Sequence, residues 1–288
     1  MSDVIEAAPK WFLEALAVPV DTGRVDVNGA SIAYRAWGEP NRPGIVLVHG
    51  GMAHSRWWDH IAPQLTDGRR VVALDLSGHG DSEWRNEYSP DDWVAEVLAV
   101  AEHGGITGRP VLVGHSMGGI VAFHASATRG ELVDRVMIFD SPIRDLTPEE
   151  LEMRVQRPES APKVYPTIDA AVARFRLVPE QDTTEPYVFD HIARSSLKSV
   201  EGGWSWKFDG NRIGRSHRTT FDQATAQNPI AYFRSENGII SDELLDQMRV
   251  MFGPDALVVE LPVAGHHPVF DQPLAVVTAI RTTLAAWG

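Results

Sequence analysis

Short apolar runs, separated by polar and turn-forming stretches, recur along the whole chain. Most of these runs are continuous rather than alternating, which is typical of strands buried on both faces of a parallel sheet. They predict central strands at residues 44–48, 70–74, 111–113, 132–139, 229–233 and 257–263. Elsewhere, apolar residues recur with the spacing of one helix face. This spacing predicts helices at residues 11–17, 55–65, 90–104 and 273–287.

An Asn-Gly dipeptide near the N-terminus marks a turn between two further strands. Residues 24–27 and 31–37 flank Asn28 and Gly29. This dipeptide favours the tight turn of a β-hairpin. We therefore expect an antiparallel pair of strands ahead of the parallel ones.

From residue 44 onward, the predicted strands and helices alternate. This alternation predicts a mostly parallel central sheet with right-handed crossovers, flanked by helices, in an α/β fold. Catalytic groups on such sheets belong at the carboxyl ends of the strands. His49, Ser116 and Asp140 all follow predicted strands. At 288 residues, the chain suits one large α/β domain, with or without an insertion.

The pattern changes after Asp140, where prolines and charges become frequent and no clear strand is visible. Helical pieces are predicted there at residues 148–156, 168–177 and 187–198. We interpret residues 142–222 as an inserted helical cap over the site. The α/β core is then formed by residues 23–141 and 223–288, and residues 1–22 form an N-terminal segment.

The composition of the chain argues against several kinds of partner and of catalytic chemistry. The net charge of −13 argues against a nucleic acid or an anionic membrane as partner. The chain has no cysteine, which excludes disulfides, thiolate metal sites and a cysteine nucleophile. No apolar run has the length of a membrane span, and no secretory signal is visible. We expect a cytoplasmic monomer or homodimer that binds a small molecule.

The sequence Gly114-x-Ser116-x-Gly118 fits the pattern of a nucleophile elbow, a sharp turn between a strand and a helix. A serine hydroxyl is a weak nucleophile, so it has to be held out of the sheet near a base. Such a turn brings the residues two positions away against neighbouring backbone, which glycine tolerates. The backbone N–H of Met117, at the start of the next helix, is then available to an oxyanion.

A second source of oxyanion donors is the sequence His49-Gly50-Gly51-Met52, which follows a central strand. Glycines there let the backbone curl over the sheet edge with free N–H groups. We expect the Gly51 amide to be the donor, with Met52 as its neighbour and His49 in a structural role. In the turn after the next strand, His79 and Asp81 are predicted to stabilise the loop.

A nucleophilic serine needs a base, and the base needs an orienting acid. His266 is the best placed of the 11 histidines, because it follows the last predicted strand behind a glycine. His267 is the adjacent competitor. His115 flanks the nucleophile, so its side chain is expected to point elsewhere.

Four motifs together resemble the α/β-hydrolase fold superfamily: 49–51 (His-Gly-Gly), 75–82 (Asp-x-x-Gly-His-Gly-x-Ser), 114–119 (Gly-His-Ser-Met-Gly-Gly) and 264–266 (Ala-Gly-His). The resemblance covers roughly residues 24–140 and 225–287. It implies that Ser116 is the nucleophile and His266 the base. It also implies that the amides of Gly51 and Met117 form the oxyanion hole.

One position departs from the common pattern of that superfamily. Most members carry the acid in a turn after the strand that follows the cap, and here that position is Gly238. Some members instead carry it at the end of the strand beside the nucleophile strand, where this chain has Asp140. We assign the acid to Asp140, with Asp242 and Glu236 as alternatives.

The resemblance implies a serine hydrolase that cleaves an ester or lactone of a small, mostly apolar substrate through an acyl-enzyme, without cofactor or metal. Alternatives with the same triad are a carbon–carbon bond hydrolase and a cofactor-free haloperoxidase or perhydrolase. A small-molecule receptor on a hydrolase scaffold is an alternative of another class. Candidate substrate contacts are Met52, Trp57, Phe175 and Trp204.

Overall fold

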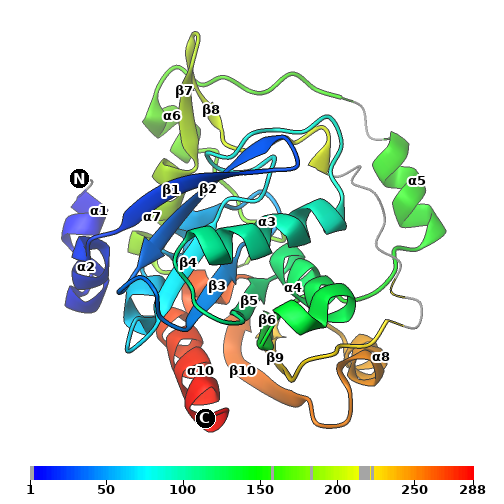
Figure 1. The fold of residues 1–288 in the computed structure, drawn as a ribbon. Coiled ribbons are helices and arrows are strands. Elements are labelled where there is room, and N and C mark those ends of the chain that lie inside the picture. The colour runs from blue at the N-terminus through cyan, green and yellow to red at the C-terminus, as the bar shows by residue number, and fades with distance from the viewer. Residues whose placement is uncertain (1–2, 157–158, 182–183, 214–220, 222–223) are drawn as a thin grey trace.

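An eight-stranded sheet runs through the centre of the computed structural model, which describes residues 3–156, 159–181, 184–213, 221 and 224–288 (Figure 1). Within these residues the strand order is β1-β2-β4-β3-β5-β6-β9-β10. The strands are β1 (Asp21–Val27), β2 (Ala30–Trp37), β3 (Gly44–Val48), β4 (Arg70–Leu74), β5 (Val111–His115), β6 (Arg135–Phe139), β9 (Ile230–Asn237) and β10 (Leu257–Gly265).

Only one end of this sheet is antiparallel. Strand β1 pairs with β2 in antiparallel register, as the Asn28-Gly29 turn predicts, and β2 also pairs with β4 in antiparallel register. All the other neighbours in the sheet run parallel. The predicted α/β fold with a mostly parallel sheet is therefore confirmed. The parallel strands also bring the residues that follow β3, β5 and β6 to one edge.

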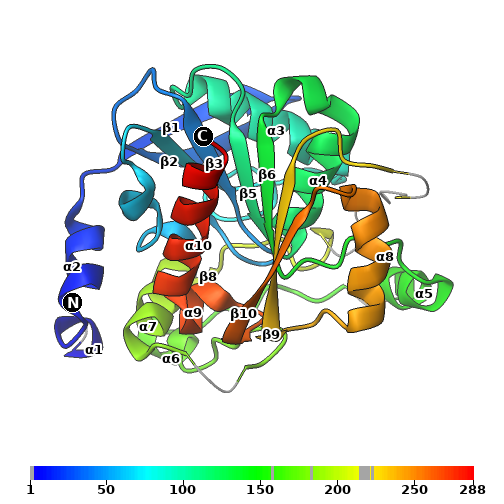
Figure 2. The ribbon, with the colours of Figure 1, turned by 90° about the horizontal axis from the view of Figure 1, so that it is seen from below.

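Helices cover both faces of the sheet (Figures 1 and 2). The helices outside the segment between β6 and β9 are α1 (Asp3–Glu6), α2 (Lys10–Ala17), α3 (Pro90–His103), α4 (Met117–Arg129), α8 (Asp242–Phe252), α9 (Pro268–Asp271) and α10 (Pro273–Ala286), of which α1 lies to one side of the sheet. Short 3₁₀ helices η1 (Ser55–Trp58) and η2 (Ala62–Leu65) lie between β3 and β4, and η3 (Gly130–Leu132) follows α4. No helix among the described residues combines the length and the apolar character that crossing a bilayer requires.

Alternate residues of each central strand enter different cores. In β3, Val46 and Val48 pack with α3, α4 and α8, whereas Ile45 and Leu47 pack with α2, α10 and the 3₁₀ helices. All four side chains are fully buried. This burial on both faces explains why the strand reads as a continuous apolar run. The sheet whose edge carries the residues of the site is therefore packed on both faces.

Between β6 and β9 the chain forms α5 (Pro148–Gln156), α6 (Ile168–Val172), α7 (Pro186–Ser195), β7 (Leu197–Val200) and β8 (Gly203–Trp206). The sequence predicts no strand in this segment. That prediction is wrong, because β7 and β8 form an antiparallel hairpin. Its turn uses positive φ angles of 82° at Gly202 and 145° at Gly203. Lys198, Ser199 and Ser205 interrupt the apolar residues of its strands, which hides the strand pattern. The predicted division into core and cap stays a prediction.

Several other predicted elements differ from the structure in extent. Strand β6 begins at Arg135 rather than at residue 132, and helix α7 ends at Ser195, before the predicted residue 198. The helix predicted at residues 55–65 is two 3₁₀ helices, because Pro63 at the start of the second lacks the N–H that a continuous helix uses. Strand β9 runs four residues beyond the predicted end, since its polar residues pair in parallel with β10. Helix α6 ends at Val172, earlier than the predicted residue 177.

Candidate active site

Ser116 lies in the sharp turn between β5 and α4. Its backbone has φ 53° and ψ −121°, a conformation that L-residues rarely adopt. The backbone N–H of Ser116 donates to Phe139 O (3.1 Å), and Ser116 O accepts from Gly119 N (2.9 Å). These bonds tie the turn to β6 and to the first turn of α4. The side chain stays half-buried at the sheet edge.

The two glycines of the motif are required by close backbone contacts. A Cβ atom on Gly114 would lie 2.2 Å from Gly118 O, and one on Gly118 would lie 2.2 Å from Val48 O. Both contacts are far inside van der Waals distance, so no side chain fits at either position. This crowding is the collision that the motif predicts around a serine in a tight turn.

Ser116 contacts His266, which follows β10, and His266 contacts Asp140, which follows β6. His266 Nδ1 lies 2.7 Å from Asp140 Oδ2, and His266 Nε2 lies 3.1 Å from Ser116 Oγ. Because a carboxylate only accepts, Nδ1–H donates to Asp140 and the Nε2 lone pair faces the serine hydroxyl. This is the tautomer that a general base for Ser116 requires.

Asp140 is fully buried and closely held. Besides His266, its carboxylate accepts from the backbone N–H groups of Ser235 and Ile239, both at 3.1 Å. The φ angle of Asp140 is 43°, so its backbone also turns sharply as the strand ends. Tyr232 holds the next peptide, because its hydroxyl donates to Ser141 O at 2.9 Å. The carboxylate therefore has fixed partners on β9, on the loop after it and on the imidazole.

Gly238, where the resemblance leads one to expect an acid, lies against this carboxylate. A Cβ atom on Gly238 would lie 2.4 Å from both carboxylate oxygens of Asp140. Any side chain at position 238 would therefore occupy the space that Asp140 fills. Glycine at position 238 therefore leaves free the space in which the carboxylate of Asp140, at the end of β6, lies.

The alternative acids lie elsewhere. Asp242 is at the start of α8, where its exposed carboxylate pairs with Arg234. Glu236 accepts from the backbone N–H of Val263 at 2.6 Å. Neither carboxylate is bonded to His266.

The loop after β3 passes beside the nucleophile. A Cβ atom on Gly50 would lie 3.3 Å from Ser116 Cβ, and one on Gly51 would lie 3.9 Å from Met117 Sδ. Among the described residues, the backbone N–H groups of Gly51 and Met117 have no hydrogen-bond acceptor. Two unengaged N–H groups thus lie on the elements that flank Ser116, as the predicted oxyanion hole requires.

His49 and Asp75 hold this loop and the next one. His49 Nδ1–H donates to Gly50 O (2.7 Å), and its Nε2 accepts from Leu76 N (3.1 Å). The carboxylate of Asp75 accepts from the backbone N–H groups of Ser55 (2.6 Å) and Asp81 (2.7 Å). The prediction that Asp81 fixes its own turn is therefore wrong, because Asp75 does so.

Asp81 and His79, both predicted to stabilise that turn, have different partners. The Asp81 carboxylate pairs with Lys207 at 2.8 Å, beyond the β7–β8 hairpin. His79 Nδ1–H donates to Ser77 O at 3.2 Å, within its own turn. Only His79 thus has its predicted role.

The predicted substrate contacts fall into two groups. Trp57 and Phe175 are buried in one run of aromatic rings that reaches His267. Trp57 packs edge to face on Phe270, Phe270 lies near Phe189, and Phe189 packs on Phe175.

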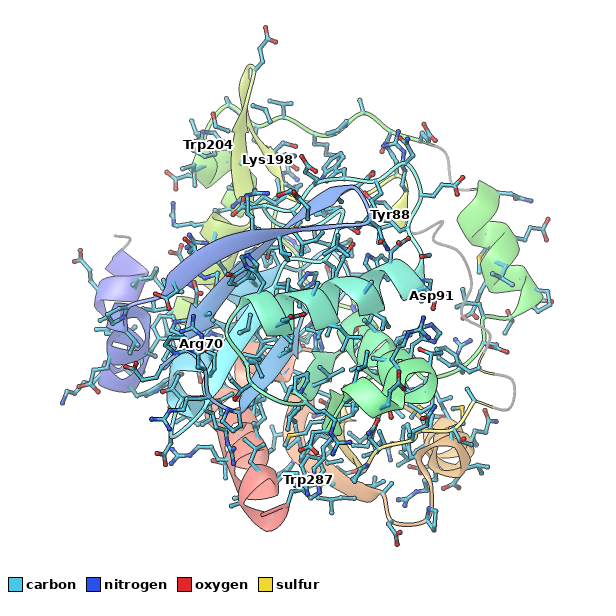
Figure 3. The ribbon with its side chains drawn as sticks, in the orientation of Figure 1. Arg70, Tyr88, Asp91, Lys198, Trp204 and Trp287 are labelled. Carbon is cyan, nitrogen blue, oxygen red and sulfur yellow. The ribbon has the colours of Figure 1, made fainter. Side chains whose placement is uncertain are left out.

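The other two predicted contacts lie apart from this run. Trp204 belongs to the β7–β8 hairpin, which projects from the body (Figure 3). Its backbone pairs with Tyr165, in the loop before α6. Met52 is 40% exposed, with a φ of 61°. The roles of all four residues stay predictions.

His267, the predicted competitor for the base, and His115, which was expected to point elsewhere, both lie beside His266. His115 Nε2–H donates to the backbone carbonyl of His266 at 2.7 Å, so its ring supports the loop that carries the base. Burial holds the pKa of His115 well below its ordinary value, and burial lowers the pKa of His267 to about 3. Both rings are therefore neutral near pH 7.

Four partners of the site were not singled out from the sequence: Tyr232, Ser235, Ile239 and Asp75. Ser235 and Ile239 bond Asp140, and Tyr232 bonds the next residue, Ser141, all from β9 and the loop after it, about 90 to 100 residues away along the chain. No local motif marks them, because two act through backbone N–H groups that every residue type offers. Asp75 is the first residue of the 75–82 motif, and its place in that motif was the signal that could have identified it.

Comparison with known proteins agrees with this geometry. The model of the alpha/beta hydrolase family matches residues 45–279, which include Ser116, Asp140 and His266. The match spans most of the chain, so the protein belongs to the alpha/beta hydrolase family and is a hydrolase.

Two curated relatives and one solved structure illustrate the similarity. The esterase Rv0045c of Mycobacterium tuberculosis is 26% identical over 277 residues, covering 90% of this chain and 88% of the esterase. The lipase LipV of the same organism is 27% identical over 259 residues, covering 85% of this chain and 95% of the lipase. A thioesterase domain from the curacin biosynthetic pathway has a TM-score of 0.77 at 22% identity, covering 91% of this chain and 99% of the domain. This last likeness shows the shared fold.

Proposed function

We propose that the protein is a serine esterase that cleaves a carboxylic ester or lactone of a small, mostly apolar substrate through an acyl-enzyme intermediate. The observation that carries this proposal is the chain of hydrogen-bond contacts from Asp140 through His266 to Ser116, at 2.7 and 3.1 Å. The esterase and lipase relatives support the ester as the bond that is cleaved.

In the first step, Ser116 Oγ attacks the ester carbonyl while His266 Nε2 takes its proton. The carboxylate of Asp140 stabilises the imidazolium that forms. The negative charge that develops on the carbonyl oxygen is held by the N–H groups of Gly51 and Met117. His266 then gives its proton to the departing alkoxide, which leaves as the alcohol.

In the second step, a water molecule replaces the alcohol. His266 takes a proton from the water, and the resulting hydroxide attacks the acyl carbonyl. Collapse of the second tetrahedral intermediate returns the proton to Ser116 Oγ and releases the carboxylic acid. A lactone follows the same path, except that the alcohol and the acid leave as one hydroxy acid.

The aromatic run supports an apolar substrate. Trp57 and Phe270 are in contact with each other, and Trp57 is also in contact with His267, the neighbour of the base. Phe189 and Phe175 continue the run into the segment between β6 and β9. Phe189 is the half-buried member of this run, and an acyl chain placed against its ring would replace water at an apolar surface, which favours burial.

Substrate turnover tests the proposal directly. The panel consists of p-nitrophenyl acetate and butyrate, a lactone, a thioester and a vinylogous diketone, compared by kcat/KM. We expect the esters or the lactone to be preferred. We also expect Ser116→Ala to lose a factor on the order of 10⁶ in kcat. Ser199→Ala, which changes an exposed serine of the hairpin, is the matched control and should retain activity.

Each other result would point away from the proposed function. Preference for the diketone would indicate a carbon–carbon bond hydrolase. Saturable binding without turnover would indicate a receptor. Turnover that survives Ser116→Ala would show that another group is the nucleophile.

A further inference from the structure

Side chains fix the loop between β10 and α9, which carries the proposed base. The carboxylate of Asp271, in α9, accepts from the backbone N–H of Gly265 at 2.7 Å. The ring of His115, which precedes the nucleophile, donates its Nε2–H to His266 O at 2.7 Å. Both of these partners lie outside the segment between β6 and β9.

A third partner of the loop comes from inside that segment. Gln181 Oε1, between α6 and α7, accepts from the backbone N–H of His267 at 2.9 Å, and Gln181 Nε2–H donates to His267 O at 3.5 Å. A little further along, the backbone N–H of Glu185 donates to Phe270 O at 2.7 Å. The chain around Gln181 thus lies along the residues that follow His266.

The glycine before His266 makes room for this glutamine. A Cβ atom on Gly265 would lie 2.8 Å from Gln181 Oε1 and 3.0 Å from Gln181 Cδ. The φ angle of Gly265 does not lie in the left-handed region, so its backbone conformation alone does not require glycine. The space that the Gln181 amide fills therefore explains why position 265 carries no side chain.

The ring of His267 faces the same loop as its backbone does. Burial lowers the pKa of His267, and the backbone carbonyls of Val178 and Pro179 oppose this lowering. The ring and the backbone of the residue after the base are thus both held by residues 178–181.

We infer that Gln181 is a positioning residue for the proposed triad, and that it acts on the His266 ring through the backbone of His267. The peptide that follows His266 helps to set where the ring points, and the ring has to reach both Asp140 at 2.7 Å and Ser116 at 3.1 Å. Small displacements of a reacting group lower the rate strongly. The effect on turnover rests on the proposed function, whereas the effect on the ring does not.

Gln181→Met tests the effect on turnover, because methionine has a similar length but offers only a weak acceptor to the backbone N–H of His267. We expect kcat for p-nitrophenyl acetate to fall roughly tenfold with KM nearly unchanged, since the triad is loosened while the aromatic run stays in place. Gln181→Glu keeps an acceptor oxygen and should retain more of kcat than Gln181→Met. This order separates the hydrogen bond from the volume of the side chain.

Gln64→Met is the matched control. Gln64 is also half-buried, and its amide donates to the His60 carbonyl at 2.8 Å, between β3 and β4. We expect the kcat and KM of this variant to equal those of the parent. Thermal unfolding is followed by circular dichroism for every variant, so that kcat is compared per folded chain.

Long-range ¹H–¹⁵N spectra of the histidine rings give a measurement that needs no turnover. They show which ring nitrogen carries the proton, and the His266 signals are assigned by their loss in His266→Gln. The parent should hold this proton on Nδ1, where it is donated to Asp140. Gln181→Met should show a mixture of the two tautomers, and Gln64→Met should keep the parent spectrum.

Gly265→Ala tests the shared space independently. Its methyl group would displace the Gln181 amide, so kcat should fall. Added to Gln181→Ala, which leaves that space empty, the same change should lower kcat by a smaller factor. Equal factors in the two backgrounds would contradict the contact on which the inference depends.

The two measurements on Gln181→Met separate the inference from the proposed function. In an active enzyme, an unchanged kcat or an unchanged His266 spectrum in Gln181→Met would overturn the inference, as would equal losses in Gln64→Met. A mixture of tautomers in Gln181→Met, found in a chain with no esterase activity, would support the positioning role and refute the proposed function.

Discussion

At the scale of single residues, the site depends on positions 140 and 238, whose side chains would occupy the same space. Position 238 is glycine because a Cβ there would lie 2.4 Å from the Asp140 oxygens. The carboxylate that fills this space is bonded to two backbone N–H groups and one imidazole. These three donors fix the position of the carboxylate. The acid at the end of β6 thus has the environment that a triad acid requires.

Replacing this carboxylate tests its role. In Asp140→Asn, the amide cannot accept from His266 Nδ1–H as a charged group does, so the useful tautomer of the base is lost. We expect kcat for p-nitrophenyl acetate to fall by a factor on the order of 10⁴, as in the analogous change to another Ser-His-Asp triad. Asp242→Asn should leave kcat unchanged, because Asp242 lies on the surface at the start of α8. An active Asp140→Asn enzyme would refute the assignment.

At the scale of elements, the segment between β6 and β9 is fastened to the core by buried polar contacts. Asp59, after η1, accepts from Arg35 Nε of β2 at 2.9 Å and from His191 Nε2 of α7 at 3.1 Å. Nearby, His54 contacts Ser196 at 2.8 Å. The Asp59 side chain is only 6% exposed. Its carboxylate therefore joins three elements in a place that excludes water.

Removing the Asp59 charge should weaken the fold measurably. Asp59→Asn leaves the largely buried Arg35 guanidinium without its charged partner. We expect the free energy of unfolding in urea to fall by about 3 kcal/mol. Asp246→Asn is the control, because Asp246 pairs with Arg249 and both side chains are exposed, at 81% and 52%, and it should cost less than about 1 kcal/mol. Equal effects in the two variants would contradict the role of burial here.

The same elements show how far the sequence could predict this fold. The central strands were visible because burial on both faces makes them continuous apolar runs. The residues that meet at the site were visible because glycines and polar groups directly follow those runs. The β7–β8 hairpin was missed, since its polar residues mask the strand pattern.

Other parts depend on contacts between distant residues. Helix α8 begins at Asp242 behind a Ser241 cap, and it was not predicted. The pairing of Gly238 with Asp140 is a contact across about 100 residues, and no local pattern encodes it.

At the scale of the whole molecule, several buried histidines link stability to pH. Besides His115 and His267, burial lowers the pKa of four histidines: His49, His54, His60 and His79. For His60 the pKa falls to about 4. In the unfolded chain these rings regain a pKa near 6.5 and bind protons that the folded state excludes.

The sign of this effect follows from proton uptake. Below about pH 6.5 the unfolded chain binds more protons than the folded one, so stability falls as the pH falls. His60 alone accounts for about 3 kcal/mol between pH 6.5 and its folded pKa. We expect the urea midpoint to drop steeply from pH 7.5 to pH 5.5. His60→Gln, which retains a donor for the Val269 carbonyl, should flatten this dependence. A constant midpoint would exclude the mechanism.

The order of the three site residues along the chain has a consequence for biosynthesis. Ser116 and Asp140 are synthesised 150 and 126 residues before His266. A nascent chain that has not yet reached β10 therefore carries the serine without the imidazole that is proposed to activate it. We expect a product truncated ahead of β10 to show no esterase activity, so that competence would arise only once β10 docks beside β9.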